Sequence, residues 1–206
     1  MIKNLLFDLG GVIMDIDRMR CVRAFQNLGF DTVGDYLTDY AQKGPFEALE
    51  EGRITAQEFR AELKRLMPEG VTDLAIDDAF QEFLTGIPVA RLHELRELRR
   101  MGLGIYLLSN TNPIMWNGRI LEEFRKEGLH RADYFDGMLP SFEAGVQKPD
   151  PRMFERARDL FGLVPSETLF IDDSQTNLDA ASALGFKTLH VAPGKEFAEL
   201  IGPFLK

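Results

Sequence analysis

Cysteine is nearly absent from this sequence, because Cys21 is the single cysteine among 206 residues. One cysteine can form neither an intrachain disulfide nor a cysteine-rich zinc site, and such sparse use is typical of a reducing compartment. The first apolar run is too short for a signal peptide, since Asp8 interrupts it. No stretch approaches the roughly 20 apolar residues that span a membrane. We therefore expect a cytoplasmic protein with no membrane partner.

Positive charge is also in short supply. Lysine and arginine number 24 against 33 aspartates and glutamates, which gives a formal net charge of -9. Nucleic acids and anionic membranes both bind to basic faces, so this balance argues against either as the main partner. A small anionic molecule remains compatible, because it needs only a locally positive pocket or a metal ion. We expect a monomer or a weak homodimer.

Short apolar runs alternate with helical patterns over most of the chain. The candidate strands are 5–7, 104–108, 134–139, 168–171 and 187–191, and the candidate helices from residue 88 onward are 88–101, 113–127, 151–161, 175–184 and 195–204. Apolar strands separated by helices are typical of a parallel sheet with helices on both faces. The predicted fold class is therefore α/β, with a doubly wound parallel sheet.

Residues 17–84 break this rhythm, because they contain helical patterns and no convincing strand. The candidate helices here are 18–28, 33–41, 46–51, 56–67 and 76–84. Thr55 and Glu58 have the spacing of a capping box, which predicts the start of the fourth helix. We expect two domains: a Rossmann-like core of residues 1–14 and 88–206, and an inserted all-helical cap of residues 15–87.

Chemically distinctive residues follow four of the predicted strands. Asp8 follows the first strand, Ser109-Asn110 the second and Asp172-Asp173 the fourth, while Lys148 lies in the loop after the third. In a parallel sheet these ends share one edge, where ligands of open α/β sheets bind. Three crowded carboxylates attract an oxygen-seeking cation, commonly Mg²⁺. A hydroxyl, an amide and an ammonium group beside that cation complement a phosphate group.

Each of these residues also has an ordinary structural interpretation. Ser109 fits a helix cap, Lys148 a solvated loop lysine, and Asp172-Asp173 an N-cap for the next helix. Their combination at one sheet edge is far more specific than any one of them.

This ordered set resembles the motifs of the haloacid dehalogenase (HAD) superfamily, over the whole chain. The helical insert is similar to the C1-type cap of that superfamily. The segments 7–17, 108–112, Lys148-Pro149 and Asp172-Asp173 are similar to its α-glucose-1-phosphate phosphatase branch. The resemblance implies a HAD-like sheet and a Mg²⁺-dependent phosphatase. Its substrate would be a small phosphorylated metabolite, such as a hexose 1-phosphate.

The resemblance also implies roles for single residues. Asp8 would be the nucleophile that forms an aspartyl-phosphate intermediate. Mg²⁺ would bind Asp8, the backbone carbonyl of Gly10 and Asp173. Asp172 would be a further ligand, or would lie next to the ligands without binding the metal itself.

The phosphate group would have binding partners of its own. Ser109 and Asn110 would donate hydrogen bonds to the phosphoryl oxygens, together with backbone N–H groups near Gly10. Lys148 would neutralise phosphate charge and orient the nucleophile, and Asn177 would hold Lys148 or the metal site in place.

Gly10 departs from the usual pattern of the superfamily. HAD phosphatases usually carry a second aspartate at this position, where it protonates the leaving alcohol. Positioned acid–base catalysis contributes about 10² to 10⁴ in rate, so its loss should slow the enzyme and favour acidic leaving groups such as the anomeric oxygen of a sugar. Asp15, Asp17 or a cap residue could supply the proton, although Asp15 and Asp17 also fit caps of the first inserted helix.

Two other functions remain open at this point. A metal-independent 2-haloacid dehalogenase also lacks the second aspartate, but it has no use for the paired acids Asp172-Asp173. A catalytically weak or non-enzymatic protein that binds a phosphorylated metabolite would also explain Gly10. Against it, a chain without catalysis has no physical reason to keep crowded carboxylates beside a lysine.

Overall fold

The computed structural model describes residues 1–38 and 42–205. At its centre is a five-stranded parallel sheet with the strand order β5-β4-β1-β6-β7. The strands are β1 (Asn4–Phe7), β4 (Gly104–Ser109), β5 (Gly137–Pro140), β6 (Thr168–Asp172) and β7 (Lys187–His190). The sheet confirms the predicted α/β class.

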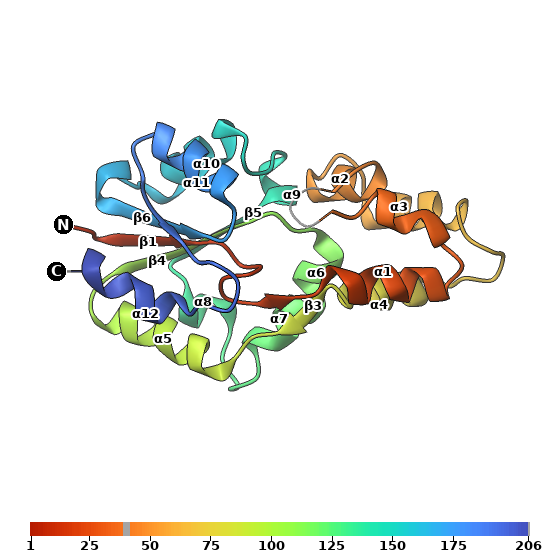
Figure 1. Ribbon diagram of the computed structural model, residues 1–206, viewed down its shortest axis with the longest axis horizontal. Coiled ribbons are helices and arrows are strands. Elements are labelled where there is room, and N and C mark those ends of the chain that lie inside the picture. The colour runs from red at the N-terminus through yellow and green to blue at the C-terminus, as the bar shows by residue number, and fades with distance from the viewer. Residues whose placement is uncertain (39–41, 206) are drawn as a thin grey trace.

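Helices cover both faces of this sheet (Figure 1). On one face lie α10 (Pro151–Phe161) and α11 (Gln175–Ala183), and on the other lie α5 (Val89–Arg100) and α12 (Phe197–Ile201). Strand β1 contributes to both layers, since Leu6 packs in the cluster with α10 and α11 while Leu5 and Phe7 pack in the cluster with α5 and α12. All three side chains are fully buried, as expected for a central parallel strand.

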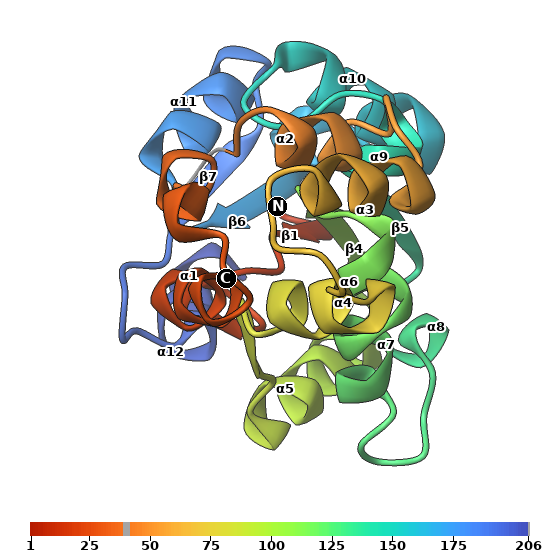
Figure 2. The ribbon, with the colours of Figure 1, turned by 90° about the vertical axis from the view of Figure 1, so that its right-hand side faces the viewer.

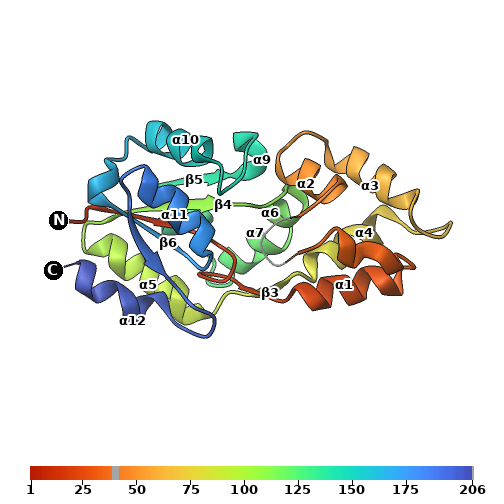
Figure 3. The same cartoon turned by 45° about the horizontal axis from the view of Figure 1, so that its top comes forward.

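Four helices extend beyond the carboxyl ends of the strands, and we call them the distal helices. They are α1 (Arg18–Asn27), α2 (Pro45–Glu50), α3 (Ala56–Lys64) and α4 (Asp73–Gln81), with the short 3₁₀ segment η1 (Asp31–Asp35) after α1. Figures 1 and 3 show them at the opposite end from the two termini, and Figure 2 shows them standing in front of the sheet. They share a phenylalanine cluster, in which the Phe46 ring lies 5.1 Å from both Phe59 and Phe80.

Two very short strands join the distal helices to the sheet. β2 (Asp15–Ile16) and β3 (Leu84–Gly86) pair in antiparallel fashion. The sequence did not predict them, because strands of two and three residues carry no readable alternation. The division into a core of residues 1–14 and 88–206 and a cap of residues 15–87 stays a prediction.

The predicted helix over 113–127 is wrong as a single element. The structure has α6 (Pro113–Asn117) and α7 (Arg119–Phe124), which meet at Gly118. A Cβ atom at Gly118 would overlap the side chain of Gln81, and that same side chain accepts a hydrogen bond from the backbone N–H of Arg119. A close contact with α4 therefore divides the helix.

The predicted strand over 134–139 begins too early. Tyr134 belongs to α8 (Arg131–Tyr134), which Asp133 caps by accepting a hydrogen bond from the N–H of His130. The remaining short elements are α9 (Ser141–Ala144), η2 (Pro165–Glu167) and η3 (Gly202–Phe204).

Two predictions within the distal helices also differ from the structure. Over the predicted helix 33–41 the described residues form η1 and a turn, and residues 39–41 lie outside the described part. The predicted helix 76–84 begins earlier, because Thr72 caps it, and ends at Gln81. None of the helices in the described chain has the length and the apolar sequence needed to cross a lipid bilayer.

Candidate active site

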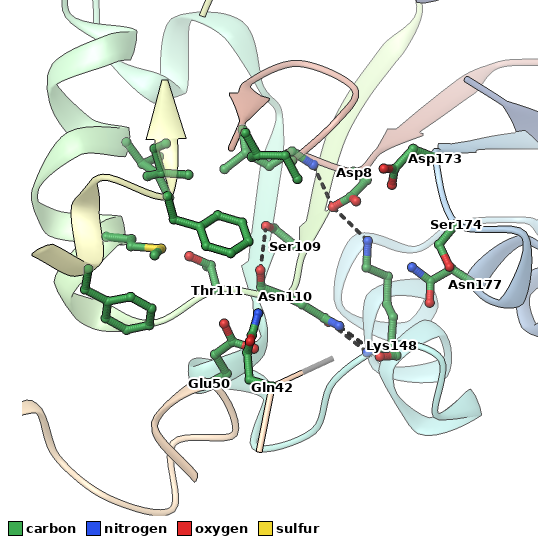
Figure 4. A pocket seen from close by; sticks show the side chains of 18 residues that line it. Asp8, Gln42, Glu50, Ser109, Asn110, Thr111, Lys148, Asp173, Ser174 and Asn177 are labelled. Atoms are coloured by element: carbon green, nitrogen blue, oxygen red, sulfur yellow. Dashed lines mark hydrogen bonds and ion pairs between the residues drawn. The ribbon is translucent and has the colours of Figure 1, made fainter. Parts of the chain in front are cut away.

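Three neighbouring strands bring the predicted site residues together. Asp8 follows β1, Ser109 ends β4, and Asp172-Asp173 ends β6, and β1 lies between the other two in the sheet. Asp8, Ser109, Lys148 and Asp173 line one cavity of about 100 Å³ (Figure 4). The parallel topology thus gathers residues that are far apart in the sequence, as predicted.

Lys148 is the electrostatic centre of this cluster. Its ammonium group lies 2.8 Å from Asp8 Oδ1 and 2.8 Å from Asp172 Oδ2, and its side chain is 1% exposed. Burial alone would lower the pKa of Lys148, but the carboxylates of Asp172 and Asp8 outweigh it and raise that pKa. Lys148 is therefore a buried, charged lysine and not a solvated loop residue.

Asp172 is held in place by several donors besides Lys148. The backbone N–H of Ser174 donates to Asp172 Oδ1 over 2.8 Å. The side-chain amide of Asn177 donates to both carboxylate oxygens over 3.1 Å. Asn177 thus acts on the lysine through Asp172. Because both oxygens of Asp172 already have partners, Asp172 positions Lys148, while Asp173 has the freer carboxylate.

Asn110 fixes the backbone of Lys148. Its amide nitrogen donates to the carbonyl of Lys148 over 2.8 Å, and its amide oxygen accepts from the N–H of Lys148 over 2.8 Å. The neighbouring Ser109 hydroxyl is 2% exposed and makes only a long, 3.4 Å contact to the carbonyl of Asn110. Ser109 is therefore available to a ligand in the cavity, whereas Asn110 already binds the lysine loop.

The carboxylates of Asp8, Asp172 and Asp173 fit a divalent metal ion. One oxygen atom from each lies within 4.8 Å of the others. Burial and the neighbouring carboxylates raise the pKa of Asp8 to about 7, against the opposing effect of Lys148. Burial and Asp172 raise the pKa of Asp173 to about 6. A cation reduces the repulsion between crowded carboxylates with raised pKa values, and a set of ligands that are all oxygen atoms suits Mg²⁺.

The turn after β1 fits closely around this metal site. Gly11 has a φ of 73°, and a Cβ atom there would overlap the Asp173 carboxyl group. Only glycine combines this backbone conformation with such a close approach. The Oδ1 atom of Asp8 also accepts a hydrogen bond from the N–H of Leu9 over 2.7 Å, which orients the carboxylate.

Neither Asp15 nor Asp17 lies in the cavity beside Asp8, where a replacement for the acid missing at Gly10 is expected. Asp15 is 53% exposed and pairs with Arg91 over 2.7 Å, and it does not line the cavity of Asp8. Asp17 caps α1, because its side chain accepts hydrogen bonds from the N–H groups of Met19 and Arg20. Of the two, Asp17 takes the capping role that the sequence suggested.

Ser174 and three other polar residues of the cavity were missed as site residues. Gln42, Glu50 and Thr111 all line it (Figure 4). Thr111 could have been found, since it stands two residues after Ser109. Glu50 carries no sequence signal, because its place in the cavity depends on how α2 packs against the rest of the molecule.

Comparison with known proteins agrees with this geometry. A family model for a hydrolase, the haloacid dehalogenase-like hydrolase, matches residues 2–185. The chain is 38% identical to the D-ribitol-5-phosphate phosphatase of Bacteroides thetaiotaomicron over 199 residues, which covers 97% of this chain and 96% of that relative.

Solved structures show the same likeness. A HAD family enzyme from Bacteroides thetaiotaomicron, solved with magnesium and inorganic phosphate, aligns with a TM-score of 0.91 and 38% identity over 97% of this chain and 99% of that one. A predicted HAD-like family hydrolase from Porphyromonas gingivalis aligns with a TM-score of 0.92 and 33% identity over 100% of this chain and 98% of the other.

Proposed function

Because this chain belongs to the haloacid dehalogenase-like hydrolase family, we propose that it hydrolyses a small phosphorylated sugar or sugar alcohol through a phosphoryl intermediate on Asp8. The enzyme is a HAD-type phosphatase, and Mg²⁺ is its cofactor. The observation that carries the proposed mechanism is the ion pair of Asp8 with the buried Lys148, beside a second and a third carboxylate.

In the first step an Asp8 oxygen attacks phosphorus, the bond from phosphorus to the leaving oxygen breaks, and the leaving oxygen takes a proton from solvent water. Lys148 opposes the rise in the pKa of Asp8, which favours the ionised carboxylate, and it balances the negative charge of the phosphoryl group. The Ser109 hydroxyl donates a hydrogen bond to a phosphoryl oxygen, with Asn110 fixing the neighbouring backbone. In the second step a water oxygen attacks phosphorus, the bond from Asp8 to phosphorus breaks, and the water releases one proton to solvent, which returns the free carboxylate and phosphate.

The metal would be held by Asp8, the backbone carbonyl of Gly10 and Asp173, with Asp172 behind them. When bound, Mg²⁺ supplies the positive charge that stabilises the transferring phosphoryl group. The partners of Asp172, namely Lys148, Ser174 and Asn177, keep that carboxylate fixed between the lysine and the metal site.

Two substrate classes are in competition. The relative with 38% identity is named for D-ribitol 5-phosphate, which favours an open-chain sugar alcohol phosphate. A hexose 1-phosphate is favoured by Gly10 instead, since an anomeric oxygen leaves without a positioned acid more readily than an ordinary alcohol does. In both cases the leaving group is a small polyhydroxylated molecule.

The same proposal covers the organisation of the protein. The core would comprise residues 1–14 and 88–206, and the distal helices, within residues 15–87, would form a cap that contacts the leaving group. The acidic chain, with a net charge of -9, supports a small-molecule substrate over nucleic acid or membrane. The proposal also includes a cytoplasmic location and a monomeric or weakly homodimeric state.

Phosphate release from a panel of phosphorylated metabolites tests the proposal. The panel includes D-ribitol 5-phosphate, glucose 1-phosphate and phenyl phosphate, each with Mg²⁺ and with EDTA. We expect metal-dependent release that Asp8→Asn abolishes. Asp17→Asn is the matched control, because it makes the same change on a residue that caps α1, where asparagine caps equally well.

The ranking of substrates decides between the two classes. Equal release in EDTA, or full activity of Asp8→Asn, would overturn the mechanism. If no phosphate ester reacts, metal-free dehalogenation of a 2-haloacid and ligand binding without turnover become the functions to test.

A further inference from the structure

Three buried polar side chains face the active-site cavity without partners. Thr111, Glu50 and Gln42 line the cavity and are 3%, 7% and 8% exposed. The Thr111 hydroxyl has no hydrogen-bond partner, and among the described residues neither the Glu50 carboxyl group nor the Gln42 amide nitrogen has one. Of the three, only the Thr111 hydroxyl is fully shielded from solvent, while the other two open onto the cavity. Buried polar groups are almost always paired, so the Thr111 hydroxyl beside two further orphan groups in one cavity indicates a polar ligand that pairs them.

The backbones of Glu50 and Thr111 are linked through the side chain of Ser141. The buried Ser141 hydroxyl lies 2.6 Å from the carbonyl oxygen of Glu50 and 2.9 Å from that of Thr111, and it accepts a hydrogen bond from the N–H of Thr111 over 3.0 Å. Gly52, just after α2, packs so closely on the backbone of Phe142 that a Cβ atom would overlap the Phe142 carbonyl. The end of α2 is therefore docked beside the loop that begins at Ser109.

Another part of the cavity wall is apolar. Its residues include Phe80, Phe83, Leu84, Met115 and Ile120. In Figure 4, Glu50 and Gln42 are drawn on one side and Asp8 with Asp173 on another. A substrate whose phosphate lies at Asp8 would place its leaving group between the apolar wall and the three orphan groups. A carbohydrate suits such a space, because its C–H groups pack on apolar side chains and its hydroxyls need polar partners.

We propose that Thr111, Glu50 and Gln42 form a hydroxyl-binding subsite that selects polyhydroxylated leaving groups. This inference rests on the proposed function, and it names the residues that choose the substrate. Each group can serve a hydroxyl. Thr111 both donates and accepts, and the Gln42 amide nitrogen donates, since its oxygen already accepts from the N–H of Thr38.

The protonation state of Glu50 suits this role. Burial, together with Glu47 and Glu51 on the same helix turn, raises the pKa of Glu50 to about 8. The other charged groups that line the cavity are Asp8, Lys148 and Asp173. At neutral pH Glu50 is thus a neutral carboxylic acid, which donates and accepts hydrogen bonds and does not repel a phosphate dianion.

Matched substrate pairs test the subsite. Each pair has leaving groups of similar size and shape with and without hydroxyls: D-ribitol 5-phosphate against n-pentyl phosphate, and glucose 1-phosphate against cyclohexyl phosphate. For the preferred polyol phosphate, we expect Thr111→Val to lower kcat/KM by about tenfold, the effect of one lost hydrogen bond. For its hydroxyl-free partner, kcat/KM should change by less than about twofold. Valine has the shape of threonine, so folding and the backbone contacts to Ser141 persist.

Glu50 provides a second, independent comparison. Glu50→Gln keeps a donor and an acceptor in the shape of a protonated carboxyl group, so polyol selectivity should persist at pH 7. Glu50→Leu removes both and should lower kcat/KM for the polyol phosphate by about tenfold or more. Glu97→Gln is the matched control, because Glu97 pairs with Arg100 at the surface of α5, away from the cavity, and it should leave selectivity unchanged.

The outcomes separate the subsite from the phosphatase mechanism. Equal losses on both members of a pair, or unchanged selectivity in both Thr111→Val and Glu50→Leu, would overturn the subsite while the enzyme remains a phosphatase. Absence of Mg²⁺-dependent release from phenyl phosphate in the unmodified protein would instead overturn the proposed function. Melting temperatures of all variants identify a loss caused by unfolding.

Discussion

At the scale of single residues, the site depends on a lysine that is buried between two carboxylates. Lys148 lies 2.8 Å from both Asp8 and Asp172, and water reaches almost none of it. Desolvation of three charged groups is costly, so this arrangement persists only because the charges are paired. The pairing also opposes the rise in the pKa of Asp8 and so favours the ionised oxygen that attacks phosphorus. Stability and catalysis are therefore coupled at this residue.

Replacing Lys148 should lower both the stability of the protein and its catalytic activity. In Lys148→Met, Asp8 and Asp172 lose their counter-charge, and the free energy of unfolding should fall by about 3–5 kcal/mol at pH 8 in EDTA. Urea unfolding measures this loss. Lys3→Met is the control, because Lys3 is 63% exposed in its pair with Glu167, and a surface pair contributes at most about 1 kcal/mol. Equal effects in the two variants would refute the role given to Lys148.

Glu50 should make stability depend on pH. The pKa of its carboxyl group is raised from 4.5 to about 8 in the folded protein. Between these values the folded state keeps a proton that the unfolded state has released, so rising pH lowers the free energy of unfolding. The loss is on the order of 3–5 kcal/mol and levels off above the folded-state pKa.

Glu50→Gln removes this dependence. Its melting temperature should exceed that of the unmodified protein by a margin that grows between pH 5 and pH 8. Glu97→Gln, on the surface of α5, should show no growing margin. If the two melting curves of Glu50→Gln and the unmodified protein stay parallel across this range, Glu50 is not a buried acid.

At the scale of elements, the turn between β1 and β2 determines how the metal ligands approach each other. Gly11 combines a φ of 73° with an Asp173 carboxyl group packed against its Cα atom. Gly11→Ala should therefore displace Asp173 and weaken Mg²⁺ binding by about tenfold or more, beyond the backbone strain of roughly 1–2 kcal/mol. Calorimetric titration with Mg²⁺ measures the affinity.

Gly128→Ala is the control that separates the effect of backbone strain from the effect of displacing Asp173. Gly128 has a φ of 74°, and a Cβ atom there would meet nothing within 4 Å. This variant should lose stability to a similar degree and bind Mg²⁺ normally. Normal Mg²⁺ affinity in Gly11→Ala would show that the close approach to Asp173 is not required.

The arrangement of the elements also explains which parts of the fold and the site could be predicted from the sequence. Asp8, Ser109 and Asp172-Asp173 directly follow apolar runs. Because the carboxyl ends of parallel strands lie at the same edge of the sheet, these residues were expected there together. Lys148 was placed there by motif order, since its loop has no periodicity. Glu50 and the strands β2 and β3 were missed, because their positions follow from contacts between elements distant in the chain. Gly118 was overlooked for the same reason, since its importance comes from Gln81 of α4.

At the scale of the whole molecule, Mg²⁺ should stabilise the folded protein. The carboxylates that we propose as ligands lie at the carboxyl ends of strands β1 and β6, and they come together only in the fold. A ligand at about 100 times its dissociation constant adds about 2.7 kcal/mol, or about 5–10 °C in melting temperature for a chain of this size. Thermal unfolding with Mg²⁺ and with EDTA measures the shift.

This shift should depend on pH in a defined direction. The pKa values of Asp8 and Asp173 are raised to about 7 and about 6 without metal, so protons compete with Mg²⁺ at lower pH. The stabilisation should be largest near pH 8 and shrink toward pH 5.5. Asp173→Asn should remove most of it, and a shift that is independent of both pH and Asp173 would place the metal elsewhere.

Chemical trapping of the intermediate on Asp8 tests the mechanism most directly. Without a side chain at Gly10 to activate water, hydrolysis of the aspartyl-phosphate should be slow enough for it to accumulate during turnover of a reactive aryl phosphate. The reaction is quenched with acid, reduced with borohydride and analysed by peptide mass spectrometry. We predict homoserine in place of aspartate at position 8, dependent on Mg²⁺ and on substrate. Steady turnover with an unmodified Asp8, or with the phosphoryl group on another residue, would contradict the mechanism.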